Sequence, residues 1–201
     1  MKKIVGILAV ILVFGFGGIA LSGSSLKKLD KSQNAVFTLD SKLLDSNMQG
    51  KMYKIKKDSI IAFSTKKFGF VGVDGIFRRF GGLLMLSESG EILQLVGEIA
   101  IDSVFSDSDG RDKHLLNSDY FDSEKFPRGS FKMRSFNAEN AELKGILTLH
   151  GISREIVFKS NLDSKNLTLN LESQINIKDF NMKGSSMSSD KVKIIIETKW
   201  E

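Results

Sequence analysis

The chain has no cysteine, and this absence excludes several kinds of site at once. Without a thiol there is no structural disulfide, no thiolate-bound metal and no cysteine for lipid acylation. A chain without cysteine is compatible with an oxidising compartment.

Histidine is almost as scarce, with only His114 and His150 in 201 residues. Neither belongs to a G-x-S-x-G nucleophile elbow, and no spacing supports a Ser-His-Asp set. Zinc favours several His or Cys ligands, and the loop around His114 offers one. The run Asp107-Ser-Asp109-Gly110 resembles the start of a calcium loop but lacks the closing glutamate. We therefore predict no catalytic residues, no metal site and no enzyme activity.

Positive charge is in small excess, with a formal net charge of +5. Lys2 and Lys3 belong to an N-terminal segment, which leaves +3 dispersed over the remainder. That excess is too small and too scattered to predict nucleic acid binding.

Proline occurs once, at Pro127, whereas there are 18 glycines and 15 phenylalanines. This composition is typical of strands joined by glycine turns. Aromatic side chains supply large apolar area, either to a solid core or to the wall of a cavity. The glycines between Gly69 and Gly82 do not form a phosphate loop, and Gly72 and Gly75 fit kinks in a curved strand.

Strict alternation of apolar and polar residues predicts an all-β fold. Leu167, Leu169 and Leu171 continue to Ile175 and Ile177 with polar residues between them, which marks a strand with one dry face. Further strands are expected at 53–55, 59–65, 73–86, 92–103, 130–136, 142–149, 152–162 and 192–200, with turns at Ser87–Glu91 and His150-Gly151. About eight long antiparallel strands favour a closed up-and-down barrel, wide enough for one small ligand. A two-sheet sandwich is the alternative.

The N-terminus has the chemistry of an export segment. Lys2 and Lys3 precede an uncharged apolar run over residues 4–21, which is near the lower limit for crossing a bilayer. Residues 1–22 are thus either a cleaved signal peptide or a single-span anchor in the inner membrane. Because Ala20-Leu21-Ser22-Gly23 is not a clean cleavage site, we predict the anchor. Both interpretations place the remainder outside the cytoplasm.

Residues 23–50 are mostly polar, and we predict a linker between the membrane and a domain at 51–201. Short elements are expected within it, a strand at 35–39 and a helix at 41–47. A flexible linker of this length would reach about 30 Å.

The stretch from Arg111 to Phe131 separates two β-rich halves and contains His114 and Pro127. It is longer than most hairpin loops, and long ordered loops are commonly functional. We expect a short helix near residues 112–118, with Asp112 as its cap, and a loop that covers one end of the barrel.

The motifs R-D-x-H-L at Arg111, D-Y-F-D at Asp119, K-F-P at Lys125 and L-T-L-H-G-I-S-R-E-I at Leu147 occur in that order. Together they resemble the YceI family over residues 53–201. The resemblance implies a lipocalin-like barrel in the periplasm with an apolar interior. It also implies a bound polyisoprenoid or fatty-acid-like lipid, no other cofactor and a possible homodimer. A family histidine position falls on Lys67.

The residues expected to bind the ligand are phenylalanines of the first β-rich half and residues of the central and second family motifs. They are Phe63, Phe68, Phe70, Phe77, Arg111, His114, Leu115, Phe121, Phe126 and His150. The function implied is carrying or sequestering a long-chain apolar lipid.

Two other functions stay open at this point. A hydrolase or metal-dependent enzyme would require His114 to converge with Asp112, Asp119 and Asp122 on an open pocket. A membrane-tethered structural or stress protein would have a solid interior, filled by side chains such as Phe63, Phe77 and Leu171.

Overall fold

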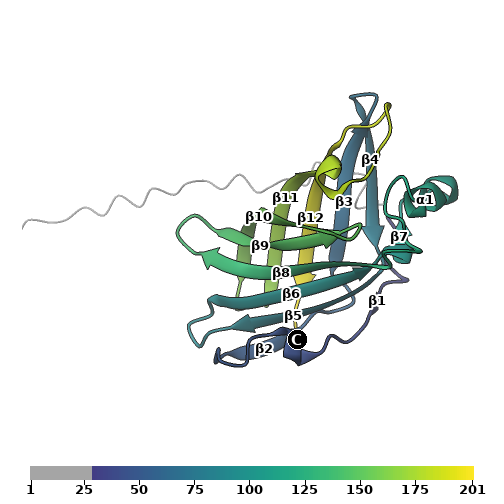
Figure 1. Ribbon diagram of the computed structural model, residues 1–201. Coiled ribbons are helices and arrows are strands. Elements are labelled where there is room, and N and C mark those ends of the chain that lie inside the picture. Colours follow the sequence, from purple (N-terminus) through teal and green to yellow (C-terminus); the bar gives the residue numbers. More distant parts are fainter. Residues whose placement is uncertain (1–28) are drawn as a thin grey trace, which may run out of the picture.

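The computed structural model describes residues 29–201, which form one strongly curled sheet with a short helix at one end (Figure 1). Neighbouring strands follow the order β1-β5-β6-β8-β9-β10-β11-β12-β3-β4-β7, and β2 adds to β5. The elements are β1 Ala35–Val36, η2 Ser41–Leu43, β2 Lys51–Lys54, β3 Ile60–Lys67, β4 Val71–Phe77, β5 Arg79–Leu86, β6 Ile92–Ala100, η3 Ile101–Ser103, β7 Val104–Phe105, α1 Asp109–Leu116, β8 Arg128–Asn137, β9 Glu142–Leu149, β10 Ile152–Asp163, β11 Thr168–Asn176, η4 Ile177–Phe180 and β12 Lys191–Lys199.

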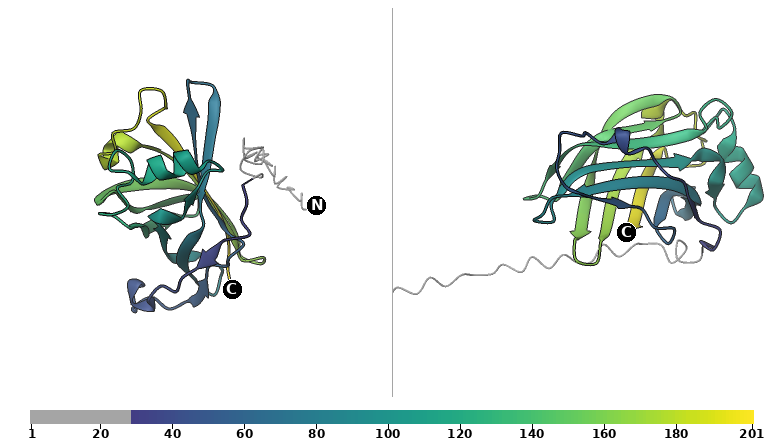
Figure 2. Two further views of the ribbon diagram at one scale, coloured as in Figure 1. Left: turned by 90° about the vertical axis from the view of Figure 1, so that its right-hand side faces the viewer. Right: turned by 90° about the horizontal axis from the view of Figure 1, so that it is seen from below.

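The curl brings both ends of the strand order toward each other. β4 and β5 are one run of chain broken only at Arg78, yet β4 pairs with β3 whereas β5 pairs with β6. Near the C-terminus, the segment after β2 joins β5 to β12. Ile55 N donates to Gly82 O at 3.1 Å, and Lys56 N donates to Lys199 O at 2.8 Å. The sheet therefore curls around one interior, and the two views of Figure 2 show this curvature.

The predicted β-rich class is confirmed, but the predicted count of about eight strands is not, since the sheet has twelve. Three of the additional strands, β1, β2 and β7, have only two to four residues. The expected single strand at 73–86 is two strands, because the chain turns at Arg78 from one neighbour to another. The sheet is also not wholly antiparallel, as β1 runs parallel to β5. No second sheet is present in residues 29–201, so the sandwich alternative is wrong.

Both predicted turns are confirmed. His150 and Gly151 join β9 to β10 with φ of 49° and 72°. Positive φ at both central residues matches the twist of the flanking strands. In the Ser87–Glu91 turn, Gly90 has φ of 86° and its N donates to Ser87 O at 3.0 Å.

The predicted helix in the central stretch exists but begins earlier. α1 covers Asp109–Leu116, and Ser108 rather than Asp112 is its N-cap residue. Asp112 lies inside the first turns, where its backbone N donates to Ser108 O at 2.9 Å. Its side chain is occupied by Ser106, so it does not cap the helix.

Residues 29–50 are not a free linker. Leu29, Leu39 and Leu44 are buried against the outer face of the sheet, and β1 pairs with β5. The apolar positions of this mostly polar segment are therefore used for packing. Of the elements predicted there, the strand is reduced to β1 and the helix to η2.

The predicted N-terminal signal or anchor helix lies outside the described residues. Within residues 29–201, the structure contains no helix with the length and apolar character needed to span a bilayer.

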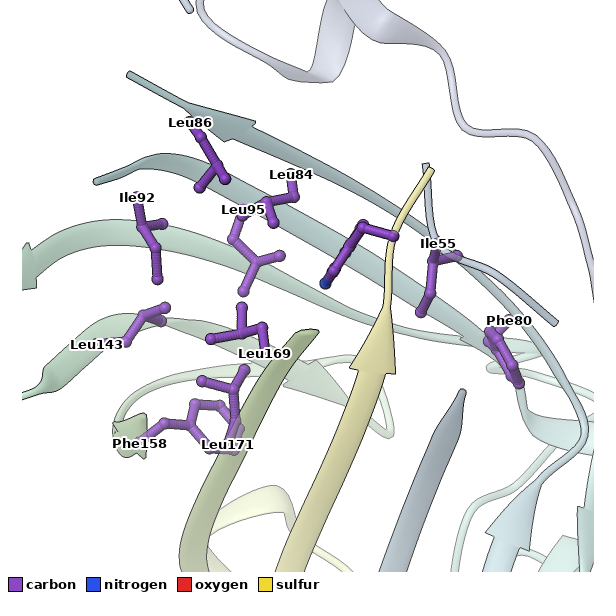
Figure 3. Close-up of a cluster of buried hydrophobic side chains, with 11 residues drawn as sticks. Ile55, Phe80, Leu84, Leu86, Ile92, Leu95, Leu143, Phe158, Leu169 and Leu171 are labelled. Atoms are coloured by element: carbon purple, nitrogen blue, oxygen red, sulfur yellow. The ribbon is translucent and has the colours of Figure 1, made fainter. Parts of the chain in front are cut away.

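The buried side chains gather on the inner face of the curl. One cluster lies at the end of the sheet near Trp200, where leucines from β5, β6, β9 and β11 meet Phe158 of β10 (Figure 3). A second cluster lies toward α1 and includes Phe77, Leu147, Ile175 and Phe180. The two clusters do not fill the interior, and a cavity remains beside them.

Candidate functional site

The interior of the sheet contains a cavity of about 710 Å³. Its wall is mostly aliphatic and aromatic. Polar and charged side chains gather where α1 and the loop 181–190 meet, among them Ser108, Arg111, His114 and Ser185. His114 is exposed, so this end is the mouth of the cavity. The opposite end, at Trp200, is closed.

Two glycines shape part of this space. Gly82 of β5 and Gly97 of β6 are direct cross-strand partners, between the pairs Leu84–Leu95 and Phe80–Ile99. Cross-strand partners present their side chains on the same face. At Gly82 the space is taken by Trp200 and Ile55, whose nearest atoms are 3.2 and 3.3 Å from a Cβ position there. A Cβ atom at Gly97 would meet only the Gly81 carbonyl oxygen, at 3.7 Å. Gly82 therefore makes room for the Trp200 ring, and Gly97 leaves part of the cavity open because β6 has no side chain there.

The closed end leaves no side-chain polar group unpaired among its central residues. Trp200 Nε1 donates to Thr198 Oγ1 at 2.9 Å, and Thr198 Oγ1 donates to Leu169 O at 2.7 Å. Trp200 and Thr198 are both buried. Because their hydrogen bonds are made within the protein, this end offers apolar contact and no free polar partner to a ligand.

Aromatic rings form the wall between the closed end and the mouth. The Phe63 ring lies over Gly75, where a Cβ atom would be 2.3 Å from its Cζ. Its centroid is 5.8 Å from that of Phe77, and Phe77 is 5.6 Å from Phe121 in an edge-on arrangement. Phe121 of the central stretch thus continues the aromatic part of the cavity wall that Phe63 of β3 and Phe77 of β4 form.

At the mouth, Arg111 is held by a buried serine. Its Nε donates to Ser106 Oγ at 2.7 Å, and its terminal nitrogen donates to the Ser106 carbonyl. Ser106 Oγ donates in turn to Asp112 Oδ1. Ser106 is 2% exposed, so this group fixes the start of α1 beside the cavity and places a guanidinium at its rim.

The opposite side of the mouth is held by the loop 181–190. Lys183 Nζ lies 2.8 Å from Asp119 Oδ1, and the Asp119 carbonyl accepts from Lys183 N at 2.8 Å. The hydrogen bond from Lys183 holds the pKa of the Asp119 carboxyl below its usual value. Burial raises the pKa of the Tyr120 phenol. His114 stacks edge-on against Tyr120, with centroids 5.0 Å apart.

The structure brings six of the ten predicted ligand-binding residues to the cavity wall. They are Phe63, Phe77, Arg111, His114, Leu115 and Phe121. Phe68 and Phe70 do not line it. They are at the tip of the β3–β4 hairpin, 55% and 81% exposed. The run of aromatics from Phe63 to Phe70 crosses from strand to turn, and alternation does not continue through a turn.

Phe126 and His150 also lie off the cavity wall, in supporting positions. His150 Nδ1 is 3.0 Å from the carbonyl oxygen of Phe180, and its ring stacks edge-on with Phe126 at 4.9 Å. Phe126 also covers Gly151. These contacts join the β9–β10 turn to η4 and to the central stretch, so the two residues stabilise the segments that form the mouth.

Several lining residues were not predicted, notably Trp200, Leu95, Met182 and Gly97. The alternation that ends at Trp200 places it on the inner face of β12, and this was a usable signal. Gly97 carries no apolar side chain, so a search for apolar residues passes over it.

The aspartates of the central stretch do not converge with His114. Asp112 bonds Ser106, Asp119 pairs with Lys183, and Asp122 accepts backbone N–H groups through its carbonyl and lies 3.9 Å from Lys125 Nζ. In residues 29–201 no three His, Asp or Glu side chains gather in a way that would hold a metal ion. The arrangement expected of a hydrolytic or metal centre is therefore not formed.

The protein is thus a β-protein whose curled sheet contains one apolar cavity, with a short helix beside the polar mouth of that cavity. Residues 28–200 match the model of the YceI-like domain, and the chain belongs to this family. The match begins before the expected residue 53 and includes the segment 29–50 that packs on the sheet.

Known relatives agree with this assignment. Protein YceI of Escherichia coli O6:H1 is 28% identical over 162 residues, covering 73% of this chain and 85% of the relative. Among solved structures, BcnA of Burkholderia cenocepacia has a TM-score of 0.59 at 18% identity, covering 70% of this chain and 94% of that one. A domain from Saccharophagus degradans, described as polyisoprenoid binding, has a TM-score of 0.54 at 15% identity, covering 76% and 99%. At these identities the structural matches show the fold.

Proposed function

We propose that the protein binds one polyisoprenoid or other long-chain apolar lipid in the cavity and carries or sequesters it. The observation that supports this most is a cavity of about 710 Å³ with a mostly apolar wall that opens at the mouth. Its volume is within the range of about 300–1,000 Å³ typical of small-molecule sites. The Saccharophagus degradans domain, which shares this fold, is described as binding the same ligand class.

Apolar burial is sufficient to drive this binding. Each CH₂ group moved from water contributes roughly 0.8 kcal/mol, so about ten buried groups would contribute roughly 8 kcal/mol before ordering costs. The closed end has no free polar partner at Trp200 and Thr198. A lipid tail is therefore the part of the ligand that fits there.

The polar end of the ligand would remain at the mouth. Arg111, Lys67 and His114 line that region, together with serines of the loop 181–190. Two of these side chains are cationic, so a polar or negatively charged end group is favoured. The lipid would then lie with its tail toward Trp200 and its end group between α1 and the loop.

A binding protein rather than an enzyme is the function we propose. Asp112 and Asp119, which would serve a hydrolase beside His114, have other partners. The solid interior expected of a structural or stress protein is not what the structure shows, because Phe63, Phe77 and Leu171 line the cavity and do not fill it. No cofactor or metal is part of this proposal, and a homodimer stays a prediction.

The setting we propose is the periplasm, on the basis of Lys2, Lys3 and the apolar run at 4–21. Fractionation with N-terminal sequencing tests it. A product beginning near Gly23 would show a cleaved signal, and a membrane-bound product with residues 4–21 intact would show the anchor. A cytoplasmic product would contradict both.

The binding proposal is tested by filling the cavity without removing any contact. Gly97→Leu adds a side chain where a Cβ atom has room and where the inner layer is open. Gly72→Leu is the matched control, because Gly72 is exposed and nothing lies within 4 Å of its Cβ position. Native mass spectrometry of each purified protein, before and after titration with a long-chain isoprenoid, measures occupancy.

We expect wild type and Gly72→Leu to carry a lipid of a few hundred daltons, and Gly97→Leu to carry much less. Thermal unfolding should show both variants folded. A clean apo mass for wild type with no uptake on titration would overturn the proposal. Equal uptake by Gly97→Leu and wild type would show that the ligand lies elsewhere.

A further inference from the structure

The tip of the β3–β4 hairpin exposes apolar side chains beside the mouth of the cavity. Phe68 is 55% exposed and Phe70 is 81% exposed, while Val71 and Met187 are exposed next to them. We refer to these four residues as the apolar tip. The other exposed large apolar side chains in residues 29–201 are Val36, Leu43, Met48, Met52 and Val157. Figure 1 shows this hairpin extending past the rest of the sheet at the end where α1 lies.

Backbone pairing fixes the apolar tip in place. Phe68 N donates to Met187 O at 2.8 Å, and Ser189 N donates to Lys66 O at 2.8 Å. Lys67 and Ser188 form a further bridge between the hairpin and the loop. Lys67, Met187 and Ser188 also line the cavity. The tip is therefore a continuation of the mouth rather than a separate surface.

Turn chemistry does not explain the phenylalanines. Phe68 and Gly69 have φ of 54° and 78°, and Phe70 N donates to Lys67 O at 3.3 Å, which defines a turn with positive φ at both central residues. Asn or Gly is favoured at such positions, and a bulky side chain is an outlier there. Phe68 thus adopts an unfavourable backbone conformation without burying its ring, and Phe70 gains no packing either.

The hairpin turn carries positive charge. Residues 64–73 contain Lys66 and Lys67 and no acidic residue, and the next acidic residue along the chain is Asp74. On the facing loop, Lys183 is paired with Asp119 and adds no unpaired charge to the tip. Lys66 and Lys67 form no ion pair with any other described residue. The Lys67 ammonium lies over the Phe68 ring, 5.2 Å from its centroid. Exposed aromatic side chains beside lysines that have no ion-pair partner match the boundary of an anionic bilayer, where rings enter the head-group layer and lysines meet lipid phosphates.

We propose that the apolar tip inserts into the surface of an anionic lipid bilayer and brings the mouth of the cavity against it. A small projecting tip suits a soft lipid surface better than a protein partner, which would require a broad complementary face. The inference rests on the proposed function in one respect, that the ligand is a membrane lipid. The contact itself does not require an occupied cavity.

The absence of native cysteine allows a direct test in the full chain. Phe70→Cys carries an environment-sensitive fluorophore at the tip, and Met52→Cys carries it on β2, an exposed site at the other end of the sheet (Figure 1). Each protein is mixed with vesicles of phosphatidylcholine, with or without phosphatidylglycerol. Emission maximum and quenching by acrylamide are recorded. Insertion of residues 4–21 into the vesicles would not by itself bury a label at residue 70, so this label reports on the tip.

We expect the label at residue 70 to shift to the blue and become several-fold less accessible to acrylamide with the anionic vesicles. The label at residue 52 should not change. High salt should weaken the shift, because exposed charges are screened. Equal behaviour of the two labels, or no response at residue 70, would overturn the proposal. Protection at residue 70 without vesicles that grows with protein concentration would also overturn it, since the tip would then contact a second copy of the chain.

A second measurement separates this inference from ligand binding. Phe70→Ser with Phe68→Ser should keep the lipid occupancy seen by native mass spectrometry but transfer lipid to vesicles about 10-fold or more slowly, as expected for the loss of exposed aromatic area. Gly97→Leu should do the reverse, losing occupancy while the label at residue 70 still responds. An unchanged transfer rate in the serine variant would show that lipid exchange does not use the tip.

Discussion

The two ends of the cavity are built in different ways. At the closed end, Trp200, Leu169 and Phe158 are almost completely buried, and the polar atoms of Trp200 and Thr198 bond within the protein. At the mouth, Arg111, His114 and Tyr120 are partly or fully exposed. Arg111 is held by hydrogen bonds to Ser106, and the Lys183–Asp119 ion pair joins the central stretch to the distant loop 181–190.

The difference indicates that the two ends of the cavity have different roles. The closed end stabilises the fold and offers contact to any apolar chain, so it confers little selectivity. The mouth contributes less burial but contains the charged side chains, so it determines how a ligand enters and which end remains outside. Substitutions at the two ends should therefore separate stability from ligand exchange.

The largest expected effect is at the closed end. Phe158 is 1% exposed and stacks edge-on with Phe131 at 5.3 Å. Phe158→Ala should lower the free energy of unfolding by about 3–5 kcal/mol, as for other large core truncations. Chemical denaturation followed by circular dichroism measures this. A loss below about 1 kcal/mol would mean that the closed end is not packed as described.

A phenylalanine of the mouth should have a smaller effect on stability. Phe121 is half-buried and packs against Phe77 beside empty space. Phe121→Ala should cost roughly 1–2 kcal/mol, since less area is lost and no closed void is made. The same variant should release bound lipid faster than Phe158→Ala does, measured as the rate of transfer to vesicles. The opposite order of release rates would contradict the division between the two ends.

Loosening the start of α1 should change exchange more than stability. Arg111→Met keeps most of the side-chain length but removes the two hydrogen bonds to Ser106. The expected cost is about 1 kcal/mol in unfolding free energy, together with faster hydrogen exchange of α1 amides. Arg111→Lys is the control that keeps the charge without the fork of donors. Unchanged α1 exchange in Arg111→Met would show that this group does not hold the helix.

The smallest effect concerns the ion pair across the mouth. The hydrogen bond from Lys183 lowers the pKa of the Asp119 carboxyl in the folded protein. The ion pair therefore stabilises the fold above the pKa that Asp119 has in the unfolded chain, and this stabilisation is lost as pH falls through the pKa of Asp119 in the folded protein. Asp119 should titrate below its ordinary value of 3.8 in carboxyl NMR, and Lys183→Met should raise that midpoint. Because both side chains are largely exposed, global stability should barely change. An unchanged midpoint in Lys183→Met would show that the pair does not form in solution.

The regular strands and tight turns could be anticipated from the sequence better than the meeting of distant segments. The alternation from Leu167 to Ile177 placed Leu169 and Leu171 inside, and the turn at His150-Gly151 was predicted with its residues. Those inferences depend on local periodicity, which neighbouring residues alone determine. The split at Arg78 and the pairing of β1 depend on where distant strands lie, and local patterns do not contain that information.

Site residues followed the same division. Phe63 and Phe77 sit within regular strands and line the cavity, whereas Phe68 and Phe70 lie past the last strand residue and are exposed to solvent. The role of Gly97 emerged only from the open space at its Cβ position. The packing of residues 29–50 was hidden by their polar composition, since three leucines suffice to hold them on the sheet.

The single tryptophan offers the most direct test of where the ligand lies, because Trp200 is at the closed end of the cavity and is the only one in the chain. Fatty acids brominated near the methyl end or near the carboxyl end are bound to the protein, and Trp200 fluorescence is recorded for each. We predict strong quenching by bromine near the methyl end and little by bromine near the carboxyl end, with neither effect in Gly97→Leu. Equal quenching by the two probes, or the reverse order, at an occupancy confirmed by native mass spectrometry would contradict a tail buried toward Trp200 with its polar end at the mouth.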